Sequence, residues 1–551
     1  MIRAFAALLV VALAALPLRA IVAHPTSLSV VPSLQVDAAA YDAIAAEIVQ
    51  TRSLEPIPPL QPPGFVLMVA AVYAVAGHSW VAAKVFLWLV FCACILMSAQ
   101  LAWRLYGQER HAWIAAVLTA SAPALRGYTG TIQYELIAAA WLLALLNLAS
   151  RARVGAVGAC VALGAMAAAA TLTREVLLAT VPVLATYVAH QQWQTHRSQR
   201  ALACTLLVLS SALLPVAGWA MLQSSRSDRI VMISDKGPLV MAFGNNPLAN
   251  GTFNAPLVGV GTPAGLPFIA AQPTRAVELM GRKFLYFWGV LRDGWNVPRP
   301  SGVWLARAAG GTVPLEAILP LVRGGGWLVA LVITLITWPR ARWRRWWVLP
   351  GTIAAVASVH LLTVSSHRFA VPVLPVTLAI IAGPLARAAT WLLTSRRRWA
   401  PCVCGLAAMV AMQRAEWPVR YSLDAAHMDG LNAANAVDPE FGLVRVADAA
   451  RGRRAALLLS DEALPHGRFD VVLRLRAAAG AAARDDGIVI ARLETATQRL
   501  CELTVTRGQA PPGQWIDVTM PCTLHQDDSV TIVVDTTGAV DVAFQSVQLR
   551  W

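Results

Sequence analysis

The chain has 551 residues, of which 57% are hydrophobic and only 14% are charged. Because about a quarter of the residues of a soluble globular protein are charged, this composition excludes an ordinary soluble domain and predicts a protein that crosses a membrane several times. The formal net charge of +15 comes almost wholly from arginines in short clusters between apolar runs. Such clusters set membrane topology, and they argue against nucleic-acid binding.

The first apolar run, residues 4–23, follows Arg3 and is either a retained membrane span or a cleaved signal peptide. Both alternatives deliver the next polar segment, residues 24–62, to the outer side of the membrane. If residues 36–49 form a helix, Asp37 and Tyr41 share one face of it. The carboxylate of Asp37 then faces a cavity, or it is an ordinary acid in the first turn of a solvated helix.

The same outer segment carries three further acids, which are predicted to be solvated charges. They are Asp42, Glu47 and Glu55. Residues 63–77 follow a Pro-Pro pair that suits the first turn of a helix. This run is too short to span a bilayer comfortably, so it predicts an interfacial or re-entrant helix.

Ten further apolar runs are long enough to predict membrane spans. They are residues 80–101, 111–127, 132–149, 154–172, 176–189, 201–222, 319–338, 346–364, 371–393 and 399–412. The loops that fall on one side carry thirteen arginines and one acid, Glu109, whereas the loops 24–62 and 223–312 fall on the other side. By the positive-inside rule, the sequence predicts about eleven spans with a cytoplasmic N-terminus and an outer C-terminus.

The composition changes after the membrane domain, which is predicted to cover residues 1–414. Residues 415–460 are predicted to be a mixed linker with helical potential. In residues 461–551 apolar and polar positions alternate in short runs, which predicts a β-sandwich outside the cytoplasm whose pattern resembles carbohydrate-binding modules. Cys501 and Cys522 lie in this region and can pair in an oxidising compartment.

Two charged residues near the outer ends of predicted spans have both a functional and a structural interpretation. Glu135 is costly at a membrane interface unless it is solvated or paired. Arg174 lies between Thr173 and Glu175, with almost no loop around it. It either contacts a phosphate or substrate, or it forms a local ion pair with Glu175.

The long outer loop and the late spans supply the remaining candidates. Asn245 and Asn246 suit a hydroxyl-rich ligand, or they form a plain turn cluster. Lys283 lies on an amphipathic stretch whose basic residues either snorkel at the interface or contact a lipid phosphate. His367 and Arg368 stand at an outer span end, where the positive-inside rule disfavours arginine and where arginine suits phosphate binding.

The order of these features resembles the polytopic glycosyltransferases of the GT-C superfamily, and most nearly the family 39 protein-mannosyltransferases and their bacterial aminoarabinose-transferase-like relatives. The features are Asp37 with Tyr41 four residues on, a Pro-Pro helix ending at Gly77, Glu135, Thr173-Arg174-Glu175, and Arg368-Phe-x-x-Pro-x-x-Pro. The resemblance covers roughly residues 1–400. The chain departs from it at Ala38, where many members have Glu, and at Phe369, where many have Tyr.

The resemblance implies a GT-C-type fold and a sugar donor carried on a polyprenyl phosphate. It also implies transfer with inversion, at the periplasmic face of the bacterial inner membrane, to a lipid, a glycan or a protein. Asp37 resembles the family's base or acceptor-orienting acid, Tyr41 would line the same cavity, and Arg368 would contact the donor phosphate.

Two other functions stay as alternatives, namely a polyprenyl-diphosphate glycan ligase and a transporter or flippase of lipid-linked sugars. The predicted partners are the lipid-linked donor, the acceptor and membrane lipids, and nucleic acid is not among them. No group of residues predicts a metal site and a monophosphate leaving group does not require a metal, so a divalent cation stays an open alternative.

Overall fold

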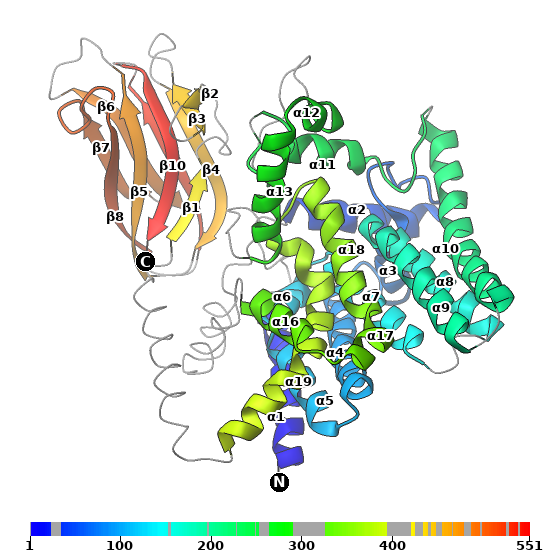
Figure 1. Ribbon diagram of the computed structural model, residues 1–551. Coiled ribbons are helices and arrows are strands. Elements are labelled where there is room, and N and C mark those ends of the chain that lie inside the picture. Colours follow the sequence, from blue (N-terminus) through cyan, green and yellow to red (C-terminus); the bar gives the residue numbers. More distant parts are fainter. Residues whose placement is uncertain are drawn as a thin grey trace. The chain divides into compact units, whose positions relative to one another are not determined.

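A computed structural model of the chain divides it into two compact units, Met1–Ala408 and Met409–Trp551. The structure describes residues 2–23, 35–151, 156–195, 198–227, 229–247, 249–252, 264–289, 326–393, 420–424, 433–438, 442–447, 454–464, 467–478, 486–495, 499–524, 528–537 and 540–550. In these residues the first unit is built of helices and the second of strands (Figure 1).

The helices of the first unit agree with most of the predicted apolar runs. They are α1 (Ile2–Ala23), α2 (Gln35–Thr51), α3 (Pro63–Ala76), α4 (Trp80–Tyr106), α5 (Glu109–Ser121), α6 (Pro123–Gly127), η2 (Tyr128–Gly130), α7 (Glu135–Ala149), α8 (Val157–Thr173), η3 (Glu175–Ala179), α9 (Thr180–Thr195), α10 (Ser198–Ser227), α11 (Lys236–Gly244), α12 (Leu266–Ala271), α13 (Pro273–Phe287), α16 (Gly326–Ile336), α17 (Arg340–Trp346), α18 (Val348–Leu362), η5 (His367–Val373) and α19 (Leu374–Leu393).

Three helices in the described part of the chain are long and apolar enough to cross a membrane, namely α4, α10 and the continuous segment His367–Arg387. Others, such as α3, α7, α8 and α18, are apolar but shorter. The predicted class, a mainly helical membrane protein with C-terminal β-sheets, is confirmed. The count of about eleven spans stays a prediction, and the predicted span 399–412 lies outside the described residues.

Prolines determine where several helices of the first unit begin or end. Pro63 is the first residue of α3, where its missing N–H costs no hydrogen bond. Ala122 is extended because it precedes Pro123, so the predicted single span 111–127 is two helices, α5 and α6. The chain then passes through η2 and an irregular stretch before α7 begins at Glu135. This stretch brings Gln133 into the interior of the unit.

Two glycines permit close approaches that draw distant segments together. A Cβ atom on Gly64 in α3 would lie 2.6 Å from Oγ1 of Thr173, so α3 packs directly against the end of α8. A Cβ atom on Gly244 would lie 1.8 Å from the carbonyl oxygen of Thr363, so the end of α11 packs against the residue that follows α18. Any larger side chain at either position would separate these segments.

The second unit contains strands from residue 420 onward. They are β1 (Arg420–Asp424), β2 (Ala433–Asp438), β3 (Gly442–Ala447), β4 (Arg454–Leu464), β5 (Gly467–Ala477), β6 (Gly487–Thr495), β7 (Arg499–Thr506), β8 (Trp515–Leu524), β9 (Asp528–Thr536) and β10 (Val542–Arg550). One antiparallel sheet has the order β2-β3-β10-β5-β8, and β1 also pairs with β10. The other has the order β4-β9-β6-β7.

The two sheets share one hydrophobic core, as the alternating pattern predicted. Val471, Leu473 and Leu475 of β5 are fully buried in it, and Val534 of β9 contributes from the other sheet. The predicted boundary was too late, since β1, β2, β3 and much of β4 lie within residues 415–460 instead of a helical linker.

A disulfide joins Cys501 of β7 to Cys522 of β8, and so connects the two sheets. Their Cα atoms are 5.7 Å apart and the two cysteines are 21 positions apart in the chain. Closing a loop of this length in the unfolded chain stabilises a fold by about 3 kcal/mol.

Candidate active site

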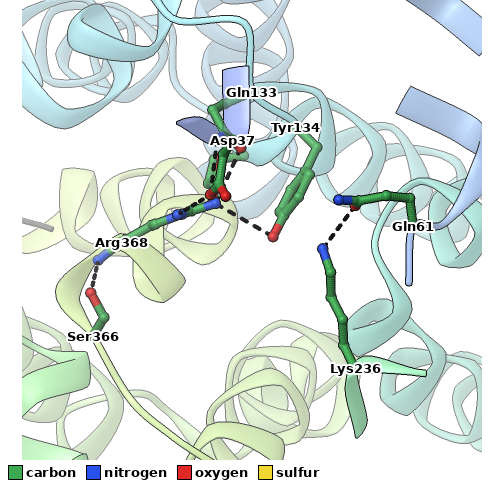
Figure 2. Close-up of polar contacts among 8 residues, drawn as sticks. Asp37, Gln61, Gln133, Tyr134, Lys236, Ser366 and Arg368 are labelled. Atoms are coloured by element: carbon green, nitrogen blue, oxygen red, sulfur yellow. Dashed lines mark hydrogen bonds and ion pairs between the residues drawn. The ribbon is translucent and has the colours of Figure 1, made fainter. Parts of the chain in front are cut away.

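The candidate active site is organised around Arg368, whose guanidinium bonds to residues from two distant segments (Figure 2). Its Nε donates to Oε1 of Glu135. Its Nη1 donates to Oδ2 of Asp37 at 3.2 Å. Its Nη2 donates to Oε1 of Gln133 at 3.1 Å and lies 3.5 Å from the hydroxyl of Tyr134. One cation therefore connects α2, the start of α7 and η5.

Local sequence places each of these side chains. Asp37 lies in the first turn of α2, and Glu135 is the first residue of α7, positions that helix dipoles favour for acids. Arg368 lies in η5, where Oγ of Ser366 accepts a hydrogen bond from the Arg368 backbone N–H at 3.2 Å. Pro372 lies inside η5 and provides no backbone donor, which keeps this segment from becoming a regular α-helix.

The two carboxylates of the cluster differ sharply in exposure. The side chain of Glu135 is 0% exposed and that of Arg368 is 8% exposed, whereas that of Asp37 is 49% exposed. A buried carboxylate needs a paired cation, so Glu135 serves as the internal counter-charge of Arg368. Asp37 bonds through Oδ2, and its Oδ1 has no bonding partner among the described residues. Asp37 is therefore the acid that a reactant can reach.

The guanidinium of Arg174 lies between two aromatic rings, one of which belongs to Tyr134 of the cluster. Its guanidinium carbon is 5.2 Å from the ring centre of Tyr134 and 5.4 Å from that of Phe369. These are cation–π distances, and the residue is only 3% exposed. Its Nη1 has no hydrogen-bond partner within the described part of the chain. The ion pair with Glu175, one of the two predicted alternatives, is not formed there, and Oε1 of Glu175 accepts a hydrogen bond from Ser234.

Tyr41 lies on the same side of α2 as the cluster. Its ring centre is 5.0 Å from that of Phe65 and 5.8 Å from that of Tyr134, both edge to face. Burial, and then the neighbouring Tyr134 and Asp37, raise the pKa of Tyr41 well above its ordinary value. The shift favours the protonated phenol, whose ring packs beside Asp37.

A second cation, Lys236, lies in a separate contact with Gln61 (Figure 2). Its Nζ donates to Oε1 of Gln61 at 2.8 Å. The backbone beside it is fixed, because the N–H of Asp235 donates to the carbonyl of Pro59 at 2.9 Å. Among the described residues, no carboxylate lies within ion-pair distance of Lys236. This partly buried ammonium thus has a neutral partner and a charge that an anion can balance.

Three of the predicted ligand residues lie elsewhere and bond to the protein itself. Nζ of Lys283 donates to Oδ1 of Asn245 at 2.8 Å, and Nδ2 of Asn245 donates to the carbonyl of Leu362 at 2.7 Å. Nδ2 of Asn246 donates to the carbonyl of Ala242 at 2.9 Å. All three side chains are buried, and the bonds of Lys283 and Asn245 fix α11 and α13 to the end of α18.

His367 lies beside Arg368 in sequence but points to a different neighbour. A Cβ atom on Gly289 would lie 2.7 Å from Cδ2 of the His367 ring. The ring therefore lies against the end of α13. Of the predicted site residues, the structure brings Tyr41, Glu135, Arg174 and Arg368 together with Asp37, and it leaves Asn245, Asn246, Lys283 and His367 outside this cluster.

The prediction that Asp42 is a solvated charge was wrong. Asp42 is 7% exposed, and its Oδ1 accepts from the Tyr73 hydroxyl at 2.5 Å and lies 2.9 Å from Nε2 of His78. The physical reason is that α3 packs on α2 and supplies Tyr73, and that His78 follows directly after α3. Glu47 and Glu55 are exposed, as predicted.

Sequence reasoning missed three polar residues, Gln133, Tyr134 and Lys236. The first two directly precede Glu135 between apolar runs, and this unbroken run of polar side chains at a span end was the available signal. The chain is rich in arginine and has only three lysines, of which Lys236 is one. No sequence feature near Lys236 indicates its contact with Gln61.

Lys283 leads to a prediction about the pH dependence of stability. Burial lowers the pKa of Lys283 to about 8, whereas a lysine in an unfolded chain has a pKa of about 10.4. Between these values the unfolded chain binds a proton that the folded chain does not, so stability should rise with pH. We expect thermal unfolding in detergent to shift upward from pH 7.5 to 9.5, and to shift less in Lys283→Met. An equal shift in both proteins would contradict the assignment.

Comparison with known proteins finds similar chains among the solved structures. No protein-family model and no curated protein matches the chain. The structure of ArnT from Cupriavidus metallidurans bound to undecaprenyl phosphate is 19% identical with a TM-score of 0.46, over 77% of this chain and 66% of that chain. The chain thus spans slightly less than two thirds of that ArnT structure.

Two further structures are similar to parts of the chain. The archaeal oligosaccharyltransferase AglB from Archaeoglobus fulgidus, in complex with an inhibitory peptide and a dolichol-phosphate, is 13% identical with a TM-score of 0.39, over 74% of this chain and 56% of that chain. The C-terminal CBM6 of LamC from Zobellia galactanivorans is 11% identical with a TM-score of 0.19, over 24% of this chain and 99% of that chain. The chain is thus similar to these solved structures at 19% identity or less and with TM-scores below 0.5.

Proposed function

We propose that the chain is a GT-C-type glycosyltransferase that moves a sugar from a polyprenyl-phosphate donor to a hydroxyl of a lipid, glycan or protein acceptor. The observation that carries this proposal is the half-exposed carboxylate of Asp37, bonded through one oxygen to a buried arginine whose charge a second, buried acid balances. Such a carboxylate has a fixed orientation, a free oxygen and access from outside. These are the properties that a general base for an acceptor hydroxyl needs.

The transfer then runs as a single displacement with inversion. Oδ1 of Asp37 takes the proton of the acceptor hydroxyl while the acceptor oxygen forms a bond to the anomeric carbon. The bond from that carbon to the phosphate oxygen breaks on the opposite face, and its electron pair stays on the leaving polyprenyl phosphate. Asp37 later releases the proton to water. The runner-up role for Asp37, an anchor that orients the acceptor without taking its proton, uses the same oxygen.

Lys236 is the cation best suited to the donor phosphate. Each guanidinium nitrogen of Arg368 already donates to Asp37, Glu135 or Gln133, so this side chain is committed to organising the carboxylates. Lys236 donates to a neutral amide and has further N–H groups for an anion. A cation at this position stabilises the charge that builds on the leaving phosphate.

Replacing Lys236 with Ala should therefore weaken donor binding. A hydrogen bond to a charged group contributes about 1.5–3 kcal/mol, so KM for the donor should rise about tenfold or more. The matched control is Arg282→Ala, which removes an exposed cation paired with Glu278 on α13. Steady-state release of polyprenyl phosphate at varied donor concentration measures the effect. An unchanged donor KM in the Lys236 variant would remove Lys236 from the donor site.

The outer position of the site and of the strand-built unit is part of this proposal. The disulfide between Cys501 and Cys522 supports it, because such bonds persist in oxidising compartments such as the periplasm. The bacterial inner membrane, with the C-terminal unit in the periplasm, fits both the disulfide and the arginine distribution.

The decisive experiment reconstitutes the purified protein in vesicles with polyprenyl-monophosphate hexoses and pentoses, and with polyprenyl-diphosphate glycans, beside membrane extract as the acceptor source. We expect sugar transfer with release of polyprenyl monophosphate from the first group alone. Transfer only from the diphosphates would favour a glycan ligase. Movement of labelled donor across the bilayer without release of its sugar would favour a flippase.

A further inference from the structure

We infer that Gln133 is a positioning residue for this reaction, and that it holds the carboxylate of Asp37 with one oxygen turned toward the acceptor. The inference rests on the proposed function. Gln133 is 0% exposed and bridges the two charged members of the cluster. Its Nε2 donates to Oδ2 of Asp37 at 3.2 Å, and its Oε1 accepts from Nη2 of Arg368 at 3.1 Å (Figure 2).

The chemistry of its two partners fixes the orientation of the Gln133 amide. A guanidinium has only donors, and an ionised carboxylate has only acceptors. The amide must therefore present its oxygen to Arg368 and its nitrogen to Asp37, since the flipped amide would lose both bonds. Glu135, two residues later, bonds to Nε of the same guanidinium, so one short segment fixes Arg368 through two of its nitrogens.

Both donors to Asp37 converge on the same carboxylate oxygen. Arg368 Nη1 and Gln133 Nε2 each lie 3.2 Å from Oδ2, and no bond to Oδ1 exists among the described residues. Two donors at one oxygen oppose rotation of the carboxylate about its Cβ–Cγ bond, which leaves the other oxygen, Oδ1, for the acceptor. With Arg368 alone, a single bond at 3.2 Å would leave the carboxylate free to turn. Gln133 thus acts through Asp37 without touching the substrate.

A nearly isosteric exchange separates positioning from a structural role. In Gln133→Glu the new carboxylate can still accept from Arg368, but it adds a buried negative charge beside Glu135 and should lower the unfolding temperature. The side chain no longer donates to Asp37 and repels it instead, so its orientation is lost. A merely structural role predicts a lower unfolding temperature with kcat unchanged in the folded protein, whereas a positioning role predicts a lower kcat in protein that stays folded.

The test measures kcat and the donor KM for polyprenyl-phosphate sugar transfer, together with thermal unfolding. For Gln133→Glu we expect kcat to fall about tenfold to a hundredfold, within the range that proton transfer by a positioned group contributes, with the donor KM within about twofold of the parent. The control is Gln50→Glu, the same exchange at an exposed position of α2, which should leave both constants unchanged.

Further outcomes keep the inference falsifiable. If Gln133→Glu unfolds, Gln133→Met, which has a similar length and neither a donor nor a strong acceptor, is expected to give the same loss of kcat. A Gln133→Glu or Gln133→Met protein with full kcat overturns the inference while leaving the proposed function intact. If the parent protein releases no polyprenyl phosphate, the proposed function fails and the role of Gln133 fails with it.

Discussion

Asp37→Asn should lose sugar transfer by about a hundredfold or more while keeping its fold. The expected size follows from the 10²- to 10⁴-fold that a positioned general base typically contributes. The fold should survive because the side chain of Asp37 is 49% exposed, and the amide oxygen of Asn can still accept from Arg368. Arg368 also keeps its buried partner Glu135, so no cation becomes unpaired inside the unit.

The measurement is sugar transfer from a polyprenyl-phosphate donor in vesicles, with thermal unfolding as the check on folding. A base and an acceptor anchor give different kinetic results. Loss of a base lowers kcat and leaves the acceptor KM nearly unchanged, whereas loss of an anchor raises the acceptor KM. Glu47→Gln is the matched control, since Glu47 is an exposed acid on the same helix. A fully active Asp37→Asn protein would contradict both roles.

Sequence patterns predicted the helices well but could not predict their contacts. Asp37 and Tyr41 were identified from their spacing on a predicted helix of the outer loop, and Glu135 and Arg368 from residue type and position at outer span ends. The family resemblance implied one cavity for Asp37 and Tyr41 and a donor contact for Arg368, but the contacts of Arg368 with Asp37 and Glu135 were not predicted, because these residues lie 331 and 233 positions away in the chain. No local sequence pattern predicts which acid a buried arginine pairs with.

Tertiary packing also explains the two clearest errors. Asp42 looked like a solvated acid because its partners, Tyr73 and His78, belong to α3 and the residues after it. The strands within residues 415–460 were missed because β2 (Ala433–Asp438) is rich in alanine and carries Asn and Asp, which are depleted in strands. Its pairing with β3 overrides this weak local preference.

The structure also changes the interpretation of Lys283. Its place on an amphipathic helix suggested a base that reaches the membrane surface. The structure shows instead that Lys283 bonds to Asn245, which in turn bonds to the end of α18. The amphipathic pattern describes α13 correctly, and only its neighbours reveal that this particular lysine faces inward.

The buried pair of Arg368 and Glu135 should dominate the stability of the site. Removing the cation in Arg368→Met leaves Glu135, which is 0% exposed, as an uncompensated buried charge. Breaking one partner of a buried ion pair costs about 3–5 kcal/mol, which is a large part of the stability of a typical protein. Arg368→Met should therefore unfold at a clearly lower temperature in detergent and should also lose activity.

A double-mutant cycle separates the structural part of this effect from the catalytic part. In Glu135→Gln with Arg368→Met both charges are gone, so much of the lost stability should return, because a neutral replacement for a buried ion pair is often well tolerated. Activity should not return, since Oδ2 of Asp37 has still lost its bond to Nη1 of Arg368. The second mutation should thus restore stability without restoring the transfer rate.

The exposed pair of Arg282 and Glu278 provides the control cycle, because its side chains are 45% and 46% exposed and its atoms are 3.0 Å apart. Its coupling energy should be below about 1 kcal/mol, as for other surface ion pairs. If the buried pair showed an equally small coupling, Glu135 would not be the counter-charge of Arg368. If activity returned in the double variant, the bond from Arg368 to Asp37 would have no part in the reaction, and Asp37 would act without it.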